Sequence, residues 1–381
     1  MKSWLSVMLF LFAFAIPAVA QDVDSEYGDT IFLYDDEGVA QKIENCKVQS
    51  STYEQVAFLP RGGKNPSTRS GTDVILVNYG DAPRVYSDGL ANLRKGFFKN
   101  AITDFDGAKT AVDLGKAGKW LLEYAAVHKA EALLGLAEKD NDPAKAADAV
   151  KEFEAALAAN EKSLLFPAIQ MGLAKAYGVQ TKWTEARAAA AKLKAAGEQI
   201  RNPIWQAEAD RTAAKILLAQ GSHTEAVNAY ESLSALAQRE GRFVKGEARK
   251  KKLADLEVEA AVEQGWAMVA WAESSKAASD WTNAESYFDG LAAKYGNNEH
   301  VQAAVLNGKG RCELEKDPRT ALALFIKAEV VYFVARAEVA RALYLKSLAL
   351  QKLGGARNRS KAEQALKDLK KFYPDSEWAR K

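Results

Sequence analysis

The hydrophobic and polar positions of this chain follow two patterns, and the first gives way to the second near Pro83. Before that point, apolar and β-branched residues form short runs at 31–34, 43–48, 56–59 and 74–77, separated by turn residues. Such runs are typical of β-strands. We predict a small β-rich domain over residues 21–82 with three to five short strands. A domain of this size has little core of its own, so we expect it to lean on the first helices.

The second pattern is helical, and it recurs along the rest of the chain. Seven small residues can be aligned, which are Ala101, Ala149, Ala186, Ala226, Ala284, Ala321 and Ala362. Four residues later stand Phe105, Phe153, Ala190, Tyr230, Phe288, Phe325 and Leu366. Seven residues later stand Ala108, Ala156, Leu193, Leu233, Leu291, Ala328 and Leu369. These spacings put each trio on one stripe of a helix.

The trio has a physical meaning in paired helices. An alanine lets the partner helix approach closely, and the larger residue four positions on fills the wedge between one hairpin and the next. Three residues before the alanine, four of the seven places hold Phe98, Trp183, His223 and Trp281. Repetition of this kind predicts stacked helical hairpins that share a continuous core.

On these residues the chain resembles a tetratricopeptide repeat (TPR) protein, whose second helices carry an A-x-x-x-F pattern followed by a small residue. The first helices fit in part, for example with Leu173, Ala174 and Tyr177 in the third unit. The resemblance covers residues 83–381 and implies an all-α helical-hairpin solenoid of about seven units. Most units are longer than the TPR standard, with extra residues at 138–146, 238–252 and 354–360. Stretched units of this kind resemble those of bacterial cell-envelope TPR proteins.

The first twenty residues have the pattern of a secretory signal peptide. Lys2 precedes an apolar stretch over residues 5–16, and Ala18-Val19-Ala20 forms a small-x-small cleavage pattern before Gln21. An uncleaved anchor is the alternative, but about a dozen apolar residues are short for the roughly 20 that span a bilayer. We therefore expect an exported protein, periplasmic or secreted, that has no membrane span after signal cleavage. A partner could still hold it at a membrane.

Composition narrows the function classes. Lys and Arg number 52 against 50 Asp and Glu, for a net charge of +2. This near balance argues against a dedicated nucleic-acid binder, which would show a strong basic excess. The two cysteines, Cys46 and Cys312, lie far apart in the chain and are expected to act as small apolar core residues rather than as a disulfide bridge.

Motifs of catalysis and cofactor binding are missing from the sequence. The three histidines, His128, His223 and His300, do not have metal-ligand spacing, and His223 takes the place of a packed aromatic residue. The Arg61-Gly62-Gly63-Lys64 stretch lacks the spacing of a phosphate-binding loop and is expected to be a solvated hairpin loop. We therefore predict no enzyme activity, no catalytic residues, no metal and no cofactor.

One basic cluster and most of the tryptophans are expected to stabilise the fold rather than to bind a ligand. Residues 249–252 read Arg-Lys-Lys-Lys and could dock an acidic partner or a lipid head group, but acidic residues follow closely. We expect the exposed start of a long helix with local charge pairing. The tryptophans of the helical part are expected in the core, with Trp266 as the exception that points toward the groove.

The TPR register implies which side chains face the concave groove. It places Met171 and Lys175, Arg211 and Lys215, Trp266 and Glu273, and Lys346 there. The cations Lys175, Arg211 and Lys215 on adjacent units could hold a carboxylate or an acidic peptide.

The leading function is a non-enzymatic exported adaptor that binds another protein or peptide on the concave face. A structural subunit of an envelope assembly is the alternative, with partners contacted through the array ends or the β-rich domain. An enzyme whose site uses no recognisable motif is a third class. The identity of the partner cannot be derived from fold-level resemblance.

Overall fold

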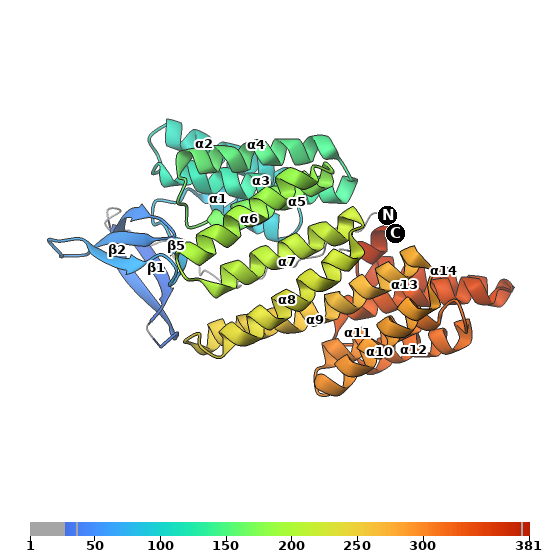
Figure 1. Cartoon of the computed structure of the whole chain (residues 1–381). Coiled ribbons are helices and arrows are strands. Elements are labelled where there is room, and N and C mark those ends of the chain that lie inside the picture. The colour runs from blue at the N-terminus through green and yellow to red at the C-terminus, as the bar shows by residue number, and fades with distance from the viewer. Residues whose placement is uncertain (1–26, 36, 375) are drawn as a thin grey trace. The chain divides into compact units, whose positions relative to one another are not determined.

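A computed structural model describes residues 27–35, 37–374 and 376–381 (Figure 1). The predicted signal peptide lies outside these residues. By their internal contacts the described residues form two compact bodies. We call residues 27–216 together with 237–254 the N-terminal lobe, and residues 217–236 together with 255–381 the C-terminal lobe.

The N-terminal lobe begins with a five-stranded antiparallel sheet in the order β4-β3-β2-β1-β5. Its strands are β1 (Asp29–Tyr34), β2 (Ala40–Ser51), β3 (Gln55–Pro60), β4 (Ser67–Ser70) and β5 (Val74–Asn78). Strands lie over all four predicted apolar runs. The strand that the apolar pattern does not reveal is β4, because its sequence STRS is polar and exposed. The turn from β3 to β4 carries Gly62 with a φ of 76° and is exposed, which confirms the predicted hairpin loop.

From residue 84 the chain is helical. The helices are α1 (Arg84–Arg94), α2 (Phe98–Asp113), α3 (Trp120–Asp140), α4 (Pro143–Ala159), α5 (Phe166–Val179), α6 (Trp183–Gln199), α7 (Pro203–Gln220), α8 (His223–Gly241), α9 (Glu247–Ser275), α10 (Ala278–Lys294), α11 (Glu299–Glu313), α12 (Pro318–Val331), α13 (Arg336–Leu353) and α14 (Ala356–Phe372), with a final 3-10 turn η2 (Glu377–Arg380). They follow one another as seven consecutive pairs, and the aligned alanines all lie in the second helix of a pair. The chain is an α-solenoid of the TPR-like type preceded by a small β-rich region.

The aligned trios form the core between helices. All seven alanines are buried, as are the aromatic rings of Phe105, Phe153, Tyr230, Phe288 and Phe325. Glycines on first helices lie opposite these rings: a Cβ added at Gly265 would stand 2.8 Å from the Phe288 ring, and one added at Gly308 of the next pair would overlap the same ring. Phe288 therefore fills the space between its own first helix and the next one, as the sequence pattern predicts.

The extra residues that make the units longer than a standard TPR unit mostly lengthen helices. Both α3, with 21 residues, and α9, with 29 residues, are longer than the other helices. Asp142 caps α4 by accepting hydrogen bonds from Ala144 N at 2.9 Å and Lys145 N at 3.3 Å, and Pro143 follows it at the first helical position. None of the described helices has an apolar stretch long enough to cross a bilayer.

Within the N-terminal lobe, the sheet is joined to the helices by aromatic contacts. Tyr79, just after β5, stacks on Trp120 of α3 with ring centroids 4.0 Å apart, and Trp120 Nε1 donates to Asp81 at 2.8 Å. Tyr53, between β2 and β3, packs against Phe166 of α5 and Trp205 of α7 at 5.3 and 5.4 Å. As expected for a small sheet, part of its core is shared with the first helices.

Both cysteines are buried and free, as predicted. Cys46 lies in the core of the sheet and Cys312 in the core formed by α9, α10 and α11. Burial raises the pKa of the Cys46 thiol to about 11 and that of the Cys312 thiol to about 12.

Candidate functional site

The predicted cations of the N-terminal lobe lie within electrostatic range of one another. Lys175 is on α5, the first helix of the third pair, and Arg211 and Lys215 are on α7, the first helix of the fourth pair. Burial lowers the pKa of Lys175, and the positive charges of Lys215 and Arg211 lower it further. The carboxylates of Glu138 and Glu131 on α3 act in the opposite direction without restoring the usual pKa. The Lys175 ammonium therefore lies where an additional negative charge would be favourable.

Arg211 is positioned differently from the two lysines. Its side chain is buried, and Nη2 lies 2.6 Å from Glu208 Oε2 one turn earlier on α7. The other oxygen of Glu208 lies 2.8 Å from Lys252 Nζ, at the start of α9. Sequence analysis did not select Glu208, although its i,i+3 spacing to Arg211 is the signal that indicates such a pair. Glu208 therefore links α7 to the start of α9, and Arg211, whose charge is balanced by this carboxylate, is a weaker candidate for contact with a partner than Lys175.

Met171 is half-buried on α5, one turn before Lys175. Because the two residues are four positions apart, both side chains lie on the same face of the helix. Met171 thus supplies an apolar neighbour on the helix face that carries Lys175. This combination suits a side chain of a partner that has an apolar stem and a charged end.

The three predicted residues of the C-terminal lobe have separate surroundings. Trp266 on α9 is half-buried, with the Arg341 guanidinium 4.1 Å from the centroid of its ring. Glu273, two turns further along α9, is exposed and lies 2.6 Å from Arg311 Nη2. Lys346 on α13 is 17% exposed, and its Nζ lies 2.5 Å from Glu329 of α12. Lys346 therefore bonds one helix pair to the preceding pair.

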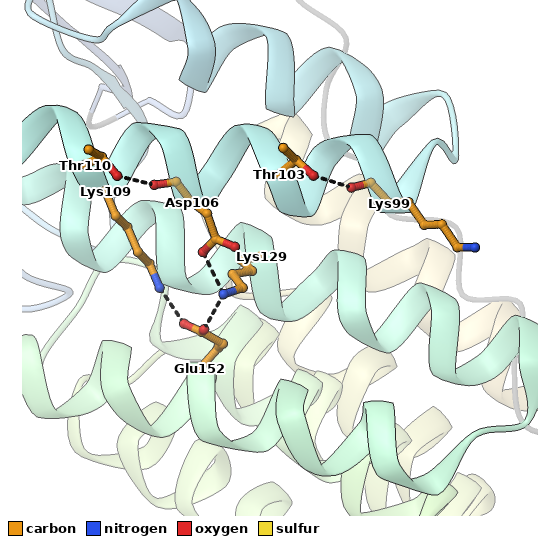
Figure 2. A network of polar contacts seen from close by, with 7 residues as sticks. All are labelled: Lys99, Thr103, Asp106, Lys109, Thr110, Lys129 and Glu152. Atoms are coloured by element: carbon orange, nitrogen blue, oxygen red, sulfur yellow. Dashed lines mark hydrogen bonds and ion pairs between the residues drawn. The ribbon is translucent and has the colours of Figure 1, made fainter.

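The same kind of bond recurs between other pairs, and Figure 2 shows the most extensive example. Lys129 of α3 lies 2.7 Å from Asp106 of α2 and 2.9 Å from Glu152 of α4, and Lys109 of α2 lies 2.6 Å from Glu152. In the C-terminal lobe, Lys309 of α11 lies 2.6 Å from Asp289 of α10. A lysine on a first helix thus bonds to an acidic residue on the second helix of the preceding pair, and these charges serve packing.

A polar network in the C-terminal lobe was missed by sequence analysis. Asn307 of α11 is fully buried, and its Nδ2 donates to the backbone oxygen and to Oε2 of Glu338 on α13, both at 2.9 Å. Arg341 Nη1 donates to Glu338 Oε1 at 2.9 Å. The available signal is a Glu-x-x-Arg spacing at the start of the otherwise apolar stretch 338–345, and charged residues are uncommon in a buried segment.

The basic cluster at the start of α9 has partners that are distant in sequence. Arg249 forms an ion pair with Asp73, in the turn between β4 and β5, and lies 5.7 Å from the ring centroid of Tyr34 in β1. Lys250 pairs locally with Glu247 at 3.0 Å. The expected start of a long helix with local pairing is confirmed for Lys250, and Arg249 and Lys252 have distant partners in addition. These two residues dock the sheet region and α7 against this helix. Nearby, Gly38 and Gly246 bring their backbones together so closely that a Cβ at Gly38 would overlap Gly246.

The histidines that can be assigned are packing residues. His128 Nδ1 lies 2.9 Å from Glu131, and its ring contacts Tyr86 and Phe105. His223 begins α8, where a packed position is predicted. Within the described residues, no group of three or more His, Cys, Asp or Glu side chains is placed to hold a metal ion.

No family model and no curated protein matches the chain. Two solved structures are similar to it in overall helical arrangement. One is the apo form of RapI, with a TM-score of 0.46 and 11% identity over 77% of this chain and 76% of that chain. The other is a Rap protein complexed with competence and sporulation factor, with a TM-score of 0.42 and 14% identity over 78% of this chain and 76% of that chain.

Proposed function

We propose that this chain is an exported, non-enzymatic adaptor that binds a protein or peptide through side chains on the first helices of its pairs. The observation that carries the proposal is the position of Lys175, a half-buried cation with two further cations in range. A carboxylate of a partner would offset both the cost of burying this ammonium and its repulsion by the two neighbouring cations. The ligand class is therefore an acidic side chain or a peptide carboxylate.

The export component rests on the first twenty residues. Their single lysine, apolar stretch and Ala-Val-Ala pattern are typical of a cleaved signal peptide. The adaptor would then act in a bacterial periplasm or outside the cell.

Capture of a partner from envelope extract by the full chain tests this function. Lys175→Gln/Lys215→Gln removes two cations and leaves the Arg211–Glu208 pair intact. Because a hydrogen bond to a charged group contributes about 1.5–3 kcal/mol, we expect affinity for the captured partner to fall at least about tenfold. Arg211→Glu is unsuitable, because it would place two carboxylates together in a buried position.

A matched control is Lys99→Gln/Lys192→Gln, which removes two exposed lysines from the second helices α2 and α6 of the same lobe. We expect it to bind the partner as the wild type does. Equal binding by both double variants, with unchanged thermal unfolding, would reject the proposed site.

The lowered pKa of Lys175 adds a pH readout. Only the protonated amine attracts a carboxylate, so affinity should decline as pH rises through the lowered pKa of Lys175. This decline should begin at a lower pH than an ordinary lysine would give. In Lys175→Gln the affinity should be lower and its decline in this range should disappear.

A structural subunit of an envelope assembly is the second candidate, and one observation favours it. The end of α12 and the turn after it expose a run of large apolar side chains, with Val330 66% and Phe333 68% exposed beside Val331 and Val334. Exposed apolar groups in sequence mark protein interaction surfaces. Recovery of a complex of fixed stoichiometry that Val330→Ser/Phe333→Ser disrupts, and that Lys175→Gln/Lys215→Gln leaves intact, would favour this role over the adaptor.

A further inference from the structure

The C-terminal lobe contains a second cluster of polar side chains that the adaptor site does not use. We call Trp266, Asn307, Arg311, Glu338 and Arg341 the inner polar cluster. These residues come from α9, α11 and α13, which are the first helices of the last three pairs. Asn307 and Arg311 are four residues apart and share one face of α11.

Part of the cluster is bonded internally, and these bonds fix its orientation. Because Asn307 Nδ2 donates twice to Glu338, Asn307 Oδ1 must point away from that carboxylate. Arg341 uses Nη1 on Glu338, and Arg311 uses Nη2 on Glu273. The guanidinium of Arg341 lies over Trp266, 4.1 Å from its ring centroid.

Four buried polar atoms of the cluster have no hydrogen-bond partner in the described part of the chain. Three are donors, namely Trp266 Nε1, Arg311 Nη1 and Arg341 Nε, and one is an acceptor, Asn307 Oδ1. The nearest ion-pair contact of Arg311 Nη1 is Glu315 Oε1 at 4.0 Å, which is beyond hydrogen-bond distance. Buried polar groups are almost always paired with protein or water, so four unpaired atoms in one cluster mark a place where an incoming polar group would gain hydrogen bonds.

The donors and the acceptor together restrict the chemistry of such a group. Arg311 and Arg341 are balanced by Glu273 and Glu338, so the cluster has no excess positive charge to attract an anion. An anion would also offer acceptors only and would leave Asn307 Oδ1 unpaired. An extended peptide main chain offers carbonyl acceptors and N–H donors in alternation, which matches both kinds of unpaired atom.

The last residues of the chain cover one side of the cluster. The ring centroid of Trp378 of η2 lies 5.2 Å from the Arg341 guanidinium, so this arginine contacts two indole rings. Trp378 also contacts Tyr344 at 5.3 Å, and Lys381 Nζ lies 3.8 Å from the Trp378 ring. The turn η2 also packs Trp378 and Ala379 against the core between α13 and α14, but it is only four residues long, which makes it easier to displace than a paired helix.

We propose that the inner polar cluster binds the extended main chain of a peptide, and that residues 376–381 form a displaceable cover over this site. The inference rests on the proposed function in that the chain is a peptide-binding adaptor, but it assigns a second site with different chemistry. Main-chain carbonyls accept from Trp266 Nε1 and Arg341 Nε, and a main-chain N–H donates to Asn307 Oδ1. Recognition of the main chain makes this site tolerant of the peptide's sequence.

The indole N–H of Trp266 is a direct reporter of this binding. The chain labelled with ¹⁵N-tryptophan gives one indole signal for each of its tryptophans, and Trp266→Phe identifies the relevant one. The probe is the neutral peptide acetyl-Gly-Ala-Gly-Ala-Gly-Ala-amide, with sodium acetate as the anion. We expect a saturable downfield shift of the Trp266 indole proton with the peptide and none with acetate.

One protein variant and one modified peptide test the cover and the main-chain contact separately. In Trp378→Ala the cover loses its ring contacts, so the same peptide should bind about fivefold to tenfold more tightly. A peptide N-methylated at its central amides lacks the N–H groups that Asn307 accepts, and we expect about tenfold weaker binding to the wild type. If Trp378→Ala is poorly folded, the N-methylated peptide still tests the site, because it is titrated into the wild-type protein.

Absence of a Trp266 shift with the neutral peptide in both proteins would overturn the inference, as would an equal shift with acetate or equal binding of the N-methylated peptide. The result is independent of the adaptor site. Lys175→Gln/Lys215→Gln should leave the Trp266 titration unchanged, so failure of one site is distinguishable from failure of the other.

Discussion

At the scale of single residues, the recurring aromatic ring requires a residue without a side chain opposite it. Glycine inside a helix costs about 1 kcal/mol relative to alanine, so its presence in first helices needs a reason. Gly172 of α5 faces the Phe153 ring so closely that an added Cβ would overlap it. The close approach of ring and backbone explains why helix-weakening residues occupy buried positions.

Gly172→Ala should therefore destabilise the protein even though alanine is the better helix former. We expect the free energy of unfolding to fall by about 1–3 kcal/mol, as for other overpacked cores, measured by urea denaturation. Gly290→Ala is the matched control, because Gly290 lies in α10 with nothing within 4 Å of an added Cβ. There the free energy of unfolding should rise by about 0.5–1 kcal/mol. A stabilising Gly172→Ala would contradict the proposed packing role.

At the scale of elements, helices of successive pairs are joined by partly buried ion pairs. Burial acts to raise the pKa of Glu152, but hydrogen bonds from Lys109 and Lys129 outweigh burial and leave this pKa below its usual value. The ionised carboxylate therefore stabilises the folded state above the pKa of an unfolded glutamate. That stabilisation is lost as pH falls through the lowered pKa of the folded state.

Lys129→Met tests the contribution of this bridge between α2, α3 and α4. We expect the free energy of unfolding at about pH 7 to fall by roughly 0.5–1.5 kcal/mol, and the difference from the wild type to shrink at about pH 3. Lys151→Met is the control, since Lys151 is exposed and pairs with Asp148 on its own helix. A difference from the wild type that stays constant across this pH range would show that Glu152 is not the group responsible.

The sequence predicted these elements better than the bonds between them. The i, i+4 and i+7 spacing locates the second helix of each pair. It does so because the trio that begins with the aligned alanine recurs in all seven pairs and faces the core. The strand β4 has no such signal, since its polar residues face water on both sides. The pair of Lys346 with Glu329 was also not foreseen: charge pairs between helices depend on the distance between partners after folding, and a register borrowed from a family does not contain it.

At the scale of the whole molecule, contacts between neighbouring helices account for most of the packing, as in other solenoids. The rings of Phe105, Phe153, Phe288 and Phe325 each face a glycine of their own pair or of the next pair. The described residues also divide into two compact lobes, which gives the chain two regions that can lose structure separately.

A core defect should therefore stay within its lobe. A Cβ at Gly310 would lie 2.5 Å from the Phe325 ring, so Gly310→Ala is expected to disturb the C-terminal lobe. By hydrogen exchange with mass spectrometry, amides of α10–α14 should exchange about tenfold faster than in the wild type. Amides of β1–β5 and α1–α6 should exchange at their original rate. Equal acceleration in both regions would show that the chain unfolds as a single cooperative body.

The two buried cysteines have a practical consequence. Only a thiolate reacts readily with maleimides, and both native thiols are shielded and hold their protons well above neutral pH. A cysteine introduced at an exposed turn position, such as Lys64 in the N-terminal lobe or Asn297 in the C-terminal lobe, would be the preferred target for a dye. Labelling both positions would let fluorescence energy transfer follow the separation of the lobes in solution without removing either native cysteine.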